Sequence, residues 1–340
     1  MRNLIVSDRE FIGNAPNLLE LLALENIDCP DDPHDRARGV LLGLAAGNLL
    51  GIPIEGLSGS AIRGRFPNGV TEIDPGEKHM PMDDDLAQAV DLGEALLDCL
   101  DCNDGPINAD WVENFSARLA RWRRESGRGI GITTSAVIEL LEAGVSPPEA
   151  GRLIYERNNR IAPNGAVMRC APVSLLWHSR PARLIGDSPI SAMVTHYSPL
   201  CQWSCLIINA TIALLLGGKA PDPASLAGAV LADGCPAEVA EWVVEVGEDI
   251  ESLRWDHPHT GHTLLCMQFG LWAALTPLNL EEAPVRVMDA GGDTDTNGAV
   301  AGAVLGARYG AGGIPERWLN CVPQQKRLEN LALKLWEAAP

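Results

Sequence analysis

Two acidic segments contain the residues best suited to chemistry. The segment 291–298 holds Asp293 and Asp295, with the hydroxyl of Thr296 beside them and glycines at both ends. Far from it in the sequence, residues 83–85 are three consecutive aspartates. Neighbouring carboxylates repel each other unless a positive charge lies between them. Oxygen ligands without sulfur or imidazole suit a hard cation such as Mg²⁺, Mn²⁺ or Ca²⁺ rather than zinc.

Each acidic segment alone also has a simpler explanation as the start of a helix. Asp and Thr are good N-caps, and acids are favoured in the first turn by the helix dipole. Three adjacent aspartates are more than a cap requires. Two such clusters in one chain are better explained by one shared site than by two separate helix caps. We therefore interpret the two segments as halves of one metal site. Five aspartates would suffice for two cations roughly 3.5–4 Å apart.

The elements that must position these residues are helices. Apolar residues recur with a helical period along most of the chain, hydrophobic residues make up 46% of it, and hardly any segment alternates as a strand should. We predict an all-α fold with a single domain over residues 34–340. The expected helices cover residues 36–50, 84–100, 108–125, 133–143, 148–158, 199–216, 223–231, 236–251, 261–275, 280–288, 294–309 and 324–339.

Three further segments stand out. Residues 1–33 are predicted to be an N-terminal extension with one apolar helical stretch at 18–24, either an arm that binds a partner or a pad on the core. Residues 56–82 form the longest expected loop and lead into the aspartates at 83–85. The small residues at 297–307 predict close helix packing in the centre of the domain.

Composition excludes several classes of function. The net charge of −19 argues against a nucleic-acid partner. We find no apolar run as long as the ~18–20 residues of a membrane span, and no signal peptide, so we expect a cytoplasmic protein without membrane contact. The nine cysteines are scattered in apolar contexts, which is typical of reduced core residues.

Five segments resemble the ADP-ribosylglycohydrolase family, which includes the dinitrogenase reductase-activating glycohydrolase and the ADP-ribosyl-arginine and ADP-ribosyl-serine hydrolases. The segments follow the family's order and span residues 36–320. They are residues 38–55 (RGVLLGLAAGNLLGIPIE), the aspartates 83–85, residues 164–172 (NGAVMRCAP), residues 195–199 (THYSP) and residues 291–302 (GGDTDTNGAVAG). The last segment is the most specific of the five.

The resemblance implies a metal centre with two Mg²⁺ ions, or Mn²⁺ in their place. Its implied ligands are Asp83, Asp84, Asp85, Asp293, Asp295 and Thr296. The implied catalytic residues are Glu55, Asp84 and Asp295, with Glu55 as a metal-linked general base or water-orienting group. Two positions depart from the family's pattern. Asp83 stands where the family usually has Thr, and Asn48 stands where it usually has Asp.

The resemblance also implies a substrate-binding wall. Asn164, Gly165 and Ala166 would present backbone N–H groups to a diphosphate. Arg169 would pair with a phosphate or with a structural carboxylate. His196 would contact ribose or the leaving group, or be a packed, hydrogen-bonded histidine. A weaker candidate for substrate contact is His262.

The function implied is that of a metal-dependent hydrolase that removes ADP-ribose from a protein side chain, with arginine favoured. Its partner would be an ADP-ribosylated protein or an ADP-ribose derivative, and the N-terminal extension would offer a contact to a transferase. A catalytically silent protein that binds ADP-ribose or neutralises a toxin is the alternative from another class. A two-metal phosphoesterase is a third, weakened by the lack of histidine ligands.

Overall fold

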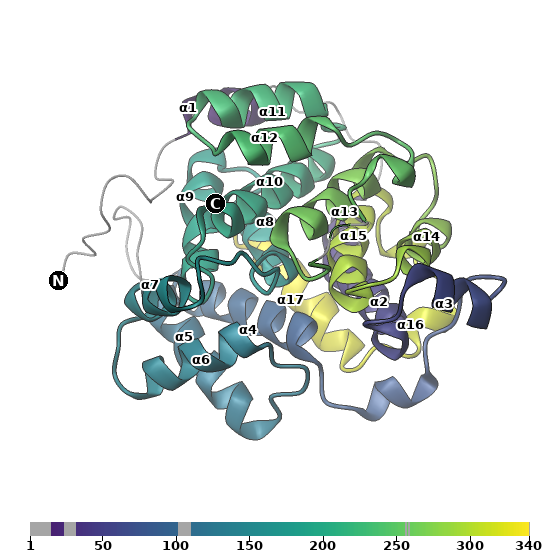
Figure 1. Ribbon diagram of the computed structural model, residues 1–340, viewed down its shortest axis with the longest axis horizontal. Helices are drawn as coiled ribbons and strands as arrows, with labels where there is room; N and C mark the ends of the chain where they lie inside the picture. Colours follow the sequence, from purple (N-terminus) through teal and green to yellow (C-terminus); the bar gives the residue numbers. More distant parts are fainter. Residues whose placement is uncertain (1–14, 24–31, 101–109, 256, 258, 340) are drawn as a thin grey trace.

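The computed structural model of the protein describes residues 15–23, 32–100, 110–255, 257 and 259–339. In this part of the chain the regular structure consists of seventeen α-helices and five short 3₁₀ helices (Figure 1). The same residues contain no strand, only two isolated β-bridges. The prediction of an all-α fold is confirmed.

The α-helices are α1 (Pro16–Leu22), α2 (Pro33–Gly51), α3 (Gly59–Arg65), α4 (Asp84–Asp98), α5 (Asp110–Glu125), α6 (Ile132–Glu142), α7 (Pro147–Arg157), α8 (Ala171–Trp177), α9 (Pro181–Met193), α10 (Pro199–Leu216), α11 (Pro223–Ala232), α12 (Ala237–Val244), α13 (Thr263–Leu275), α14 (Glu282–Ala290), α15 (Thr294–Tyr309), α16 (Glu316–Leu319) and α17 (Gln325–Glu337). The 3₁₀ helices are η1 (Ile52–Ile54), η2 (Pro75–His79), η3 (Val167–Arg169), η4 (Ile250–Ser252) and η5 (Ala311–Gly313).

Two antiparallel helices, α2 and α15, form the centre of the molecule and touch through their backbones. A Cβ atom added at Gly43 would lie 2.2 Å from the carbonyl oxygen of Gly302, which is closer than any side chain allows. Glycines four residues apart repeat this contact along both helices. The facing pairs are Gly39 with Gly306, Gly43 with Gly302, and Gly47 with Gly298. The close packing predicted for residues 297–307 is confirmed, and its partner is the glycine row of α2.

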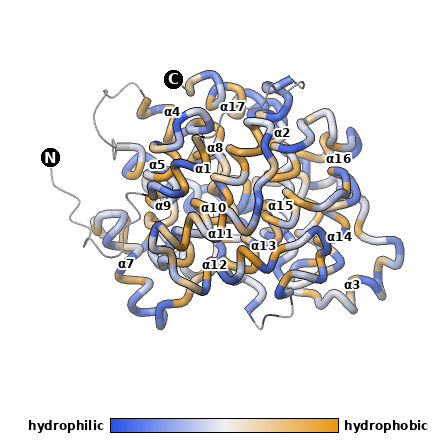
Figure 2. The backbone as a smooth tube through the Cα atoms, turned by 90° about the horizontal axis from the view of Figure 1, so that it is seen from above, coloured by the Kyte–Doolittle hydropathy of each residue, from blue (hydrophilic) through white to orange (hydrophobic). Residues whose placement is uncertain are grey.

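Other helices surround this pair. Helices α10 and α13 pack against α15, whereas α17 packs against α2. Figure 2 shows apolar colours around α10 and α15 in the middle of the molecule and hydrophilic colours along its outer loops. By length and composition, the stretch Pro33–Ile54 and helix α10 resemble membrane spans, so our expectation that no apolar run is long enough is wrong. Their apolar character is explained by the core, because 83% of each stretch is buried inside the protein.

Helix α1 packs on α11 (Figure 1). Asp233 accepts hydrogen bonds from the backbone N–H groups of Asn17 at 3.0 Å and Leu18 at 2.8 Å, and the Leu18 side chain is fully buried. The described part of the N-terminal segment is thus a pad on the domain. Residues 1–14 and 24–31 lie outside the described residues, so the domain boundary at 33 and a transferase contact stay predictions.

Most expected helices are present with ends shifted by at most three residues, and the exceptions have identifiable causes. The segment predicted as one helix at 236–251 is α12, which ends at Val244, followed by η4. The expected loop 56–82 contains α3 and η2. We did not predict α9, because it carries Pro189 in its interior and proline indicates a helix end. Helices α8 and α16 are short and were also not predicted.

The contact between α2 and α15 generates a stability prediction. In Gly302→Ala the added methyl group would lie 2.1 Å from the carbonyl oxygen of Gly43, so the helices must separate. We expect the free energy of unfolding to fall by about 1–3 kcal/mol, as for other overpacked cores. The measurement is urea unfolding followed by circular dichroism.

The matched control is Gly228→Ala. Gly228 also lies inside a helix, α11, but it is exposed and a Cβ atom there meets nothing within 4 Å. This substitution should leave stability unchanged or raise it by up to about 1 kcal/mol. Equal effects of the two substitutions would contradict the close backbone contact.

Candidate functional site

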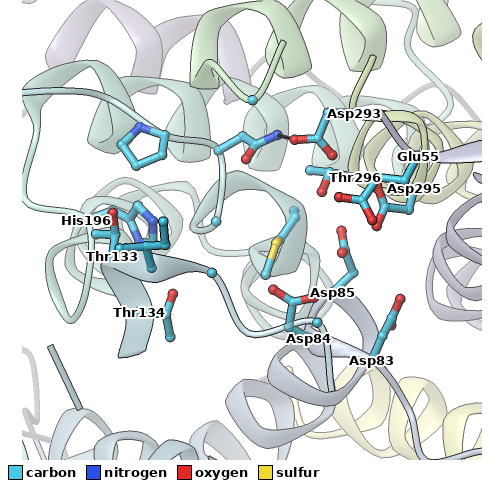
Figure 3. Close-up of a pocket in the computed structure, with 18 of the residues that line it drawn as sticks. Glu55, Asp83, Asp84, Asp85, Thr133, Thr134, His196, Asp293, Asp295 and Thr296 are labelled. Carbon is cyan, nitrogen blue, oxygen red and sulfur yellow. Dashed lines mark hydrogen bonds between the residues drawn. The ribbon is translucent and has the colours of Figure 1, made fainter. Parts of the chain in front are cut away.

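One pocket of about 600 Å³ gathers most of the predicted site residues (Figure 3). It lies where the C-terminal end of α2, the N-termini of α4 and α15 and the segment after α7 meet. The predicted residues that line it are Glu55, Asp83, Asp84, Asp85, Asn164, Gly165, His196, Asp293, Asp295 and Thr296. Acidic segments more than 200 positions apart in the sequence therefore share one cavity, as we predicted.

The N-terminus of α15 is fixed against the end of α2. The Thr294 hydroxyl donates a hydrogen bond to the carbonyl oxygen of Gly51 at 2.9 Å. A Cβ atom at Gly51 would lie 2.3 Å from the backbone nitrogen of Asp295, so only glycine permits this approach. Asp295 is the first acidic residue inside α15, and the close approach holds its carboxylate at the floor of the pocket.

Glu55 is held beside Asp293 by two backbone hydrogen bonds. The N–H of Gly56 donates to the carbonyl oxygen of Gly292, and the N–H of Gly292 donates to that of Leu57, both at 2.8 Å. Gly56 and Gly292 have φ angles of +75° and +78°, a region that favours glycine. The glycines that precede Asp293 in the sequence thus connect its segment to the loop that carries Glu55.

The aspartates 83–85 begin at Asp83, which is the N-cap of α4. Its Oδ1 accepts from the N–H of Leu86 at 3.4 Å, and its Oδ2 accepts from Nδ2 of Asn48 at 2.8 Å. The segment before it is tied down by Arg128, which donates to both carboxylate oxygens of Glu77 at 2.8 and 2.9 Å. The two residues that depart from the family's pattern, Asn48 and Asp83, are therefore direct partners.

The carboxylates form two groups that share one residue. Oxygen atoms of Glu55, Asp293 and Asp295 lie within 4.8 Å of one another, and so do those of Asp83, Asp85 and Asp295. One oxygen each of Asp85 and Asp295 is buried without a hydrogen-bond partner among the described residues. Unpartnered carboxylate oxygens in groups made only of oxygen donors are suited to a hard cation, so these residues would fit such an ion.

Asp84 differs from its neighbours. It lines the pocket but belongs to neither of the two groups found among the described residues. Gly129, whose φ angle is +79°, faces it so closely that a Cβ atom there would lie 2.4 Å from Asp84 Oδ1. The arrangement places Asp83, rather than Asp84, next to Asp85 and Asp295.

These carboxylates are difficult to ionise together without a cation. Burial, followed by the charge of Asp83, raises the pKa of Asp84 to about 8. Burial, followed by the charge of Asp293, raises the pKa of Asp295 to about 9. Burial also raises the pKa of Asp85 well above its usual range, and the charge of Asp295 adds to this effect. Bound cations would offset both causes, because they neutralise the repulsion and replace the lost hydration.

The opposite wall of the pocket carries neutral hydrogen-bond donors. The N–H of Asn164 donates to the carbonyl oxygen of Gly261 at 3.0 Å, beside the β-bridge between Pro163 and His262. The Asn164 side chain donates to Asp293 Oδ2 at 3.0 Å and so connects this wall to the carboxylates. Figure 3 shows His196 and Thr133 on the side of the pocket away from the carboxylates.

Three of the predicted contacts on this wall are not found. His262 does not line the pocket, because its Nδ1 accepts from the N–H of Leu264 at 3.4 Å and so caps α13. Ala166, whose backbone N–H was expected to face the diphosphate, is also not among the residues that line the pocket. Arg169 reaches neither a phosphate site nor a structural carboxylate; its hydrogen-bond partners are Gln88 and Thr195.

Some residues that line the pocket were not among the site residues predicted from the sequence. Arg128 and Gly129 come from the loop before α6, and Met168 comes from η3. The alternating glycines at 127, 129 and 131 were the available signal, because they predict a tight loop in front of a helix.

Comparison with known proteins agrees with this geometry. The sequence model of the ADP-ribosylglycohydrolase family matches residues 30–340. The chain is 28% identical over 316 residues to the ADP-ribosylarginine hydrolase Tri1 of Serratia proteamaculans, covering 90% of this chain and 80% of that protein. It is also 28% identical over 297 residues to the ADP-ribosyl-[dinitrogen reductase] glycohydrolase of Rhodospirillum rubrum, covering 84% and 90% of the two chains.

A solved structure described as an ADP-ribosylglycohydrolase-related protein complex superposes with a TM-score of 0.69 at 28% identity. The match covers 91% of this chain and 99% of that chain. The family match extends over nearly the whole chain, and the fold and the conjunction of acidic segments agree with it. The protein therefore belongs to the ADP-ribosylglycohydrolase family of hydrolases.

Proposed function

We propose that this hydrolase uses two Mg²⁺ ions and removes ADP-ribose from an arginine side chain of a protein. The observation that carries the proposal is the pair of carboxylate groups that share Asp295, with Glu55 in one of them. The choice of arginine is supported by the relative named as an ADP-ribosylarginine hydrolase.

The residues that would hold the cations follow from the two groups. Glu55, Asp293 and Asp295 would hold one ion, and Asp83, Asp85 and Asp295 the other. All of these donors are oxygen atoms, which suits Mg²⁺ and also Mn²⁺. Such cations would supply Lewis-acid stabilisation of the oxygen atoms that react and would fix the ribose hydroxyls.

Glu55 is the residue best placed to accept a proton. Its carboxylate is the most exposed member of the two groups. Without cations, burial and then the charges of Asp293 and Asp83 raise the pKa of Glu55. With cations bound, its carboxylate would be ionised and able to accept a proton. Glu55 would take one proton of the attacking water, whose oxygen bonds to the anomeric carbon. The carbon–nitrogen bond breaks with its electron pair on the nitrogen, so the cationic guanidinium of the substrate leaves as a neutral guanidine, which then regains a proton.

The other wall would hold the anionic part of ADP-ribose. The net charge of −19 repels a diphosphate at long range, so local donors must bind it. His196 offers such a donor on the side of the pocket away from the carboxylates, and the loop that contains Asn164 and Gly165 connects it to Asp293. Separate walls for cations and for the diphosphate would set the direction in which the substrate lies.

The first prediction concerns the metals. Asp295→Asn removes the carboxylate that both groups share, so we expect the release of ADP-ribose from an ADP-ribosyl-arginine peptide to slow by more than roughly 100-fold. EDTA should abolish turnover of the original protein, and Mg²⁺ should restore it. The control, Glu238→Gln, removes an exposed carboxylate of α12 and should leave the rate unchanged. Turnover that survives both EDTA and Asp295→Asn would refute metal dependence.

The second prediction concerns the base. Glu55→Gln keeps the shape of the side chain but cannot accept a proton at neutral pH. We expect kcat to fall by about 10²–10⁴-fold. An unchanged kcat would rule out Glu55 as the base. If the original protein binds ADP-ribose tightly but cleaves no arginine, serine or O-acetyl linkage, the catalytically silent alternative is correct.

The third prediction concerns pH and stability. Without cations, folded Asp84 and Asp295 keep protons that the unfolded chain has already released, because their pKa values are raised to about 8 and about 9. The folded state then binds more protons than the unfolded state between about pH 5 and 9, so stability falls as pH rises through this window. Melting curves in EDTA should show this fall.

Mg²⁺ should therefore raise the melting temperature more at pH 9 than at pH 6. Asp295→Asn serves as the control, because a neutral amide removes one titrating group and should flatten the pH dependence. A melting temperature that rises with pH in EDTA would show that the carboxylates ionise freely in the folded protein.

A further inference from the structure

Arg169 is a buried charge without a carboxylate partner. Its side chain is fully buried, and among the described residues its hydrogen bonds go only to two neutral acceptors, Oε1 of Gln88 and Oγ1 of Thr195. The guanidinium also lies over the ring of Phe115, 5.1 Å from its centroid. A buried charge without a counter-ion is costly. Burial lowers the pKa of Arg169 only to about 10, so it remains a cation at neutral pH.

The charge determines which way the Thr195 hydroxyl points. A guanidinium can only donate, so Oγ1 of Thr195 must accept the hydrogen bond from Nη2 of Arg169, at 2.5 Å. The hydroxyl has one proton of its own. Its other partner is Nδ1 of His196 at 2.7 Å. A hydroxyl oxygen can accept two hydrogen bonds, so a protonated Nδ1 could also donate to it, but the hydroxyl proton would then have no acceptor among the hydrogen bonds of the described residues. The arrangement that satisfies every group is the one in which Thr195 donates its proton to Nδ1. Nδ1 of His196 is therefore an acceptor and carries no hydrogen.

His196 is consequently neutral with its proton on Nε2. Burial, together with the nearby charge of Arg169, lowers the pKa of His196 to about 3, so the imidazolium form is absent at neutral pH. A neutral imidazole whose Nδ1 accepts a hydrogen bond carries its hydrogen on the other nitrogen.

The Nε2 atom lies on the side of the ring that faces the substrate loop. His196 lines the pocket, and a Cβ atom at Gly165 would lie 2.8 Å from its Nε2. Figure 3 shows the ring beside Thr133, across the cavity from Asp83 and Asp293. The free N–H is thus in the part of the pocket assigned to the anionic portion of the ligand.

We infer that Arg169 and Thr195 are positioning residues that fix His196 as the neutral Nε2–H tautomer, a hydrogen-bond donor to a diphosphate oxygen of the bound ligand. The identity of that ligand rests on the proposed function, whereas the tautomer does not. The three residues form a relay: Arg169 donates to Thr195, Thr195 donates to His196, and His196 donates into the pocket.

The relay has two physical effects. Hydrogen bonds in a chain polarise one another, so the charge of Arg169 strengthens the outer Nε2–H as a donor. The donor also carries no net charge of its own, and therefore binds an anion without titrating across neutral pH. The charge that attracts the ligand stays buried behind two neutral groups, and it makes no hydrogen bond to a carboxylate among the described residues.

The first test reads the tautomer directly in the protein without ligand. The chain has seven histidines, and nitrogen-15 labelling with His196→Ala assigns the signals of His196. We expect a protonated Nε2 and an unprotonated Nδ1 that persist from pH 5 to 8. Thr195→Val should abolish this preference, and Thr195→Ser, which keeps the hydroxyl, should restore it. A protonated Nδ1 in the original protein would overturn the inference, whatever the protein hydrolyses.

The second test measures binding by calorimetry with ADP-ribose and with ADP. Thr195→Val should weaken both ligands on the order of tenfold, which corresponds to about one hydrogen bond. The same substitution in a His196→Ala background should have no further effect, because Thr195 acts through His196. If the effects of the two substitutions on the binding free energy were fully additive, Thr195 would have only a structural role, and the relay would be contradicted.

The two tests separate this inference from the proposed function. If the original protein shows the Nε2–H tautomer but binds neither ADP-ribose nor ADP, the ligand assignment fails along with the proposed function. If it binds ADP-ribose and His196→Ala weakens ADP-ribose but not ADP, the donor contacts the distal ribose, and the diphosphate contact is wrong. Since Thr195→Ser retains the hydroxyl, loss of the tautomer in that variant would also count against the relay.

Discussion

The structure depends on a contact in which no side chain separates two helices. Where Gly43 meets Gly302, the backbones of α2 and α15 approach until a single methyl group would not fit. The contact repeats along three glycine pairs and ends at Gly51, against the backbone nitrogen of Asp295. Because the helices are antiparallel, the end of α2 and the start of α15 must lie together. The position of the pocket is a consequence of this packing.

The same packing brings together charges that oppose folding. Asp85 and Asp295 are buried at the junction, and their unpartnered oxygens find no donor among the described residues. Distant Lys and Arg side chains cannot offset the repulsion among these carboxylates, because interactions between charges are screened beyond roughly 10 Å. The protein as a whole also has a net charge of −19. Close packing at the glycine contact raises the free energy of unfolding, whereas the burial and mutual repulsion of the carboxylates at its end lower it. A site strained in this way has a built-in affinity for cations.

The sequence was sufficient for the fold class and for the acidic wall, because both leave local signals. Helical periodicity can be seen in a single sequence, and two clusters that together hold five aspartates are unusual wherever they lie. The opposite wall was harder to predict, since its roles depend on partners that sequence spacing does not reveal. His262 was expected to reach the substrate but caps α13, and Arg169 was expected to pair with an anion but holds a hydroxyl. Nothing local distinguishes a histidine that lines a pocket from one that caps a helix.

Asn48 and Asp83 show how two departures from a pattern become one change in three dimensions. The resemblance implies Asp at 48 and Thr at 83, so each residue alone alters the charge of the site. The structure joins them by a hydrogen bond of 2.8 Å, in which the amide donates to the carboxylate. An Asp at 48 beside Asp83 would place two buried carboxylates in contact, and their repulsion would oppose folding. The amide replaces that repulsion with a hydrogen bond. The pair therefore keeps one carboxylate, but that carboxylate belongs to Asp83 at the N-cap of α4 instead of to residue 48 in α2. An oxygen of Asp83 lies close to oxygens of Asp85 and Asp295.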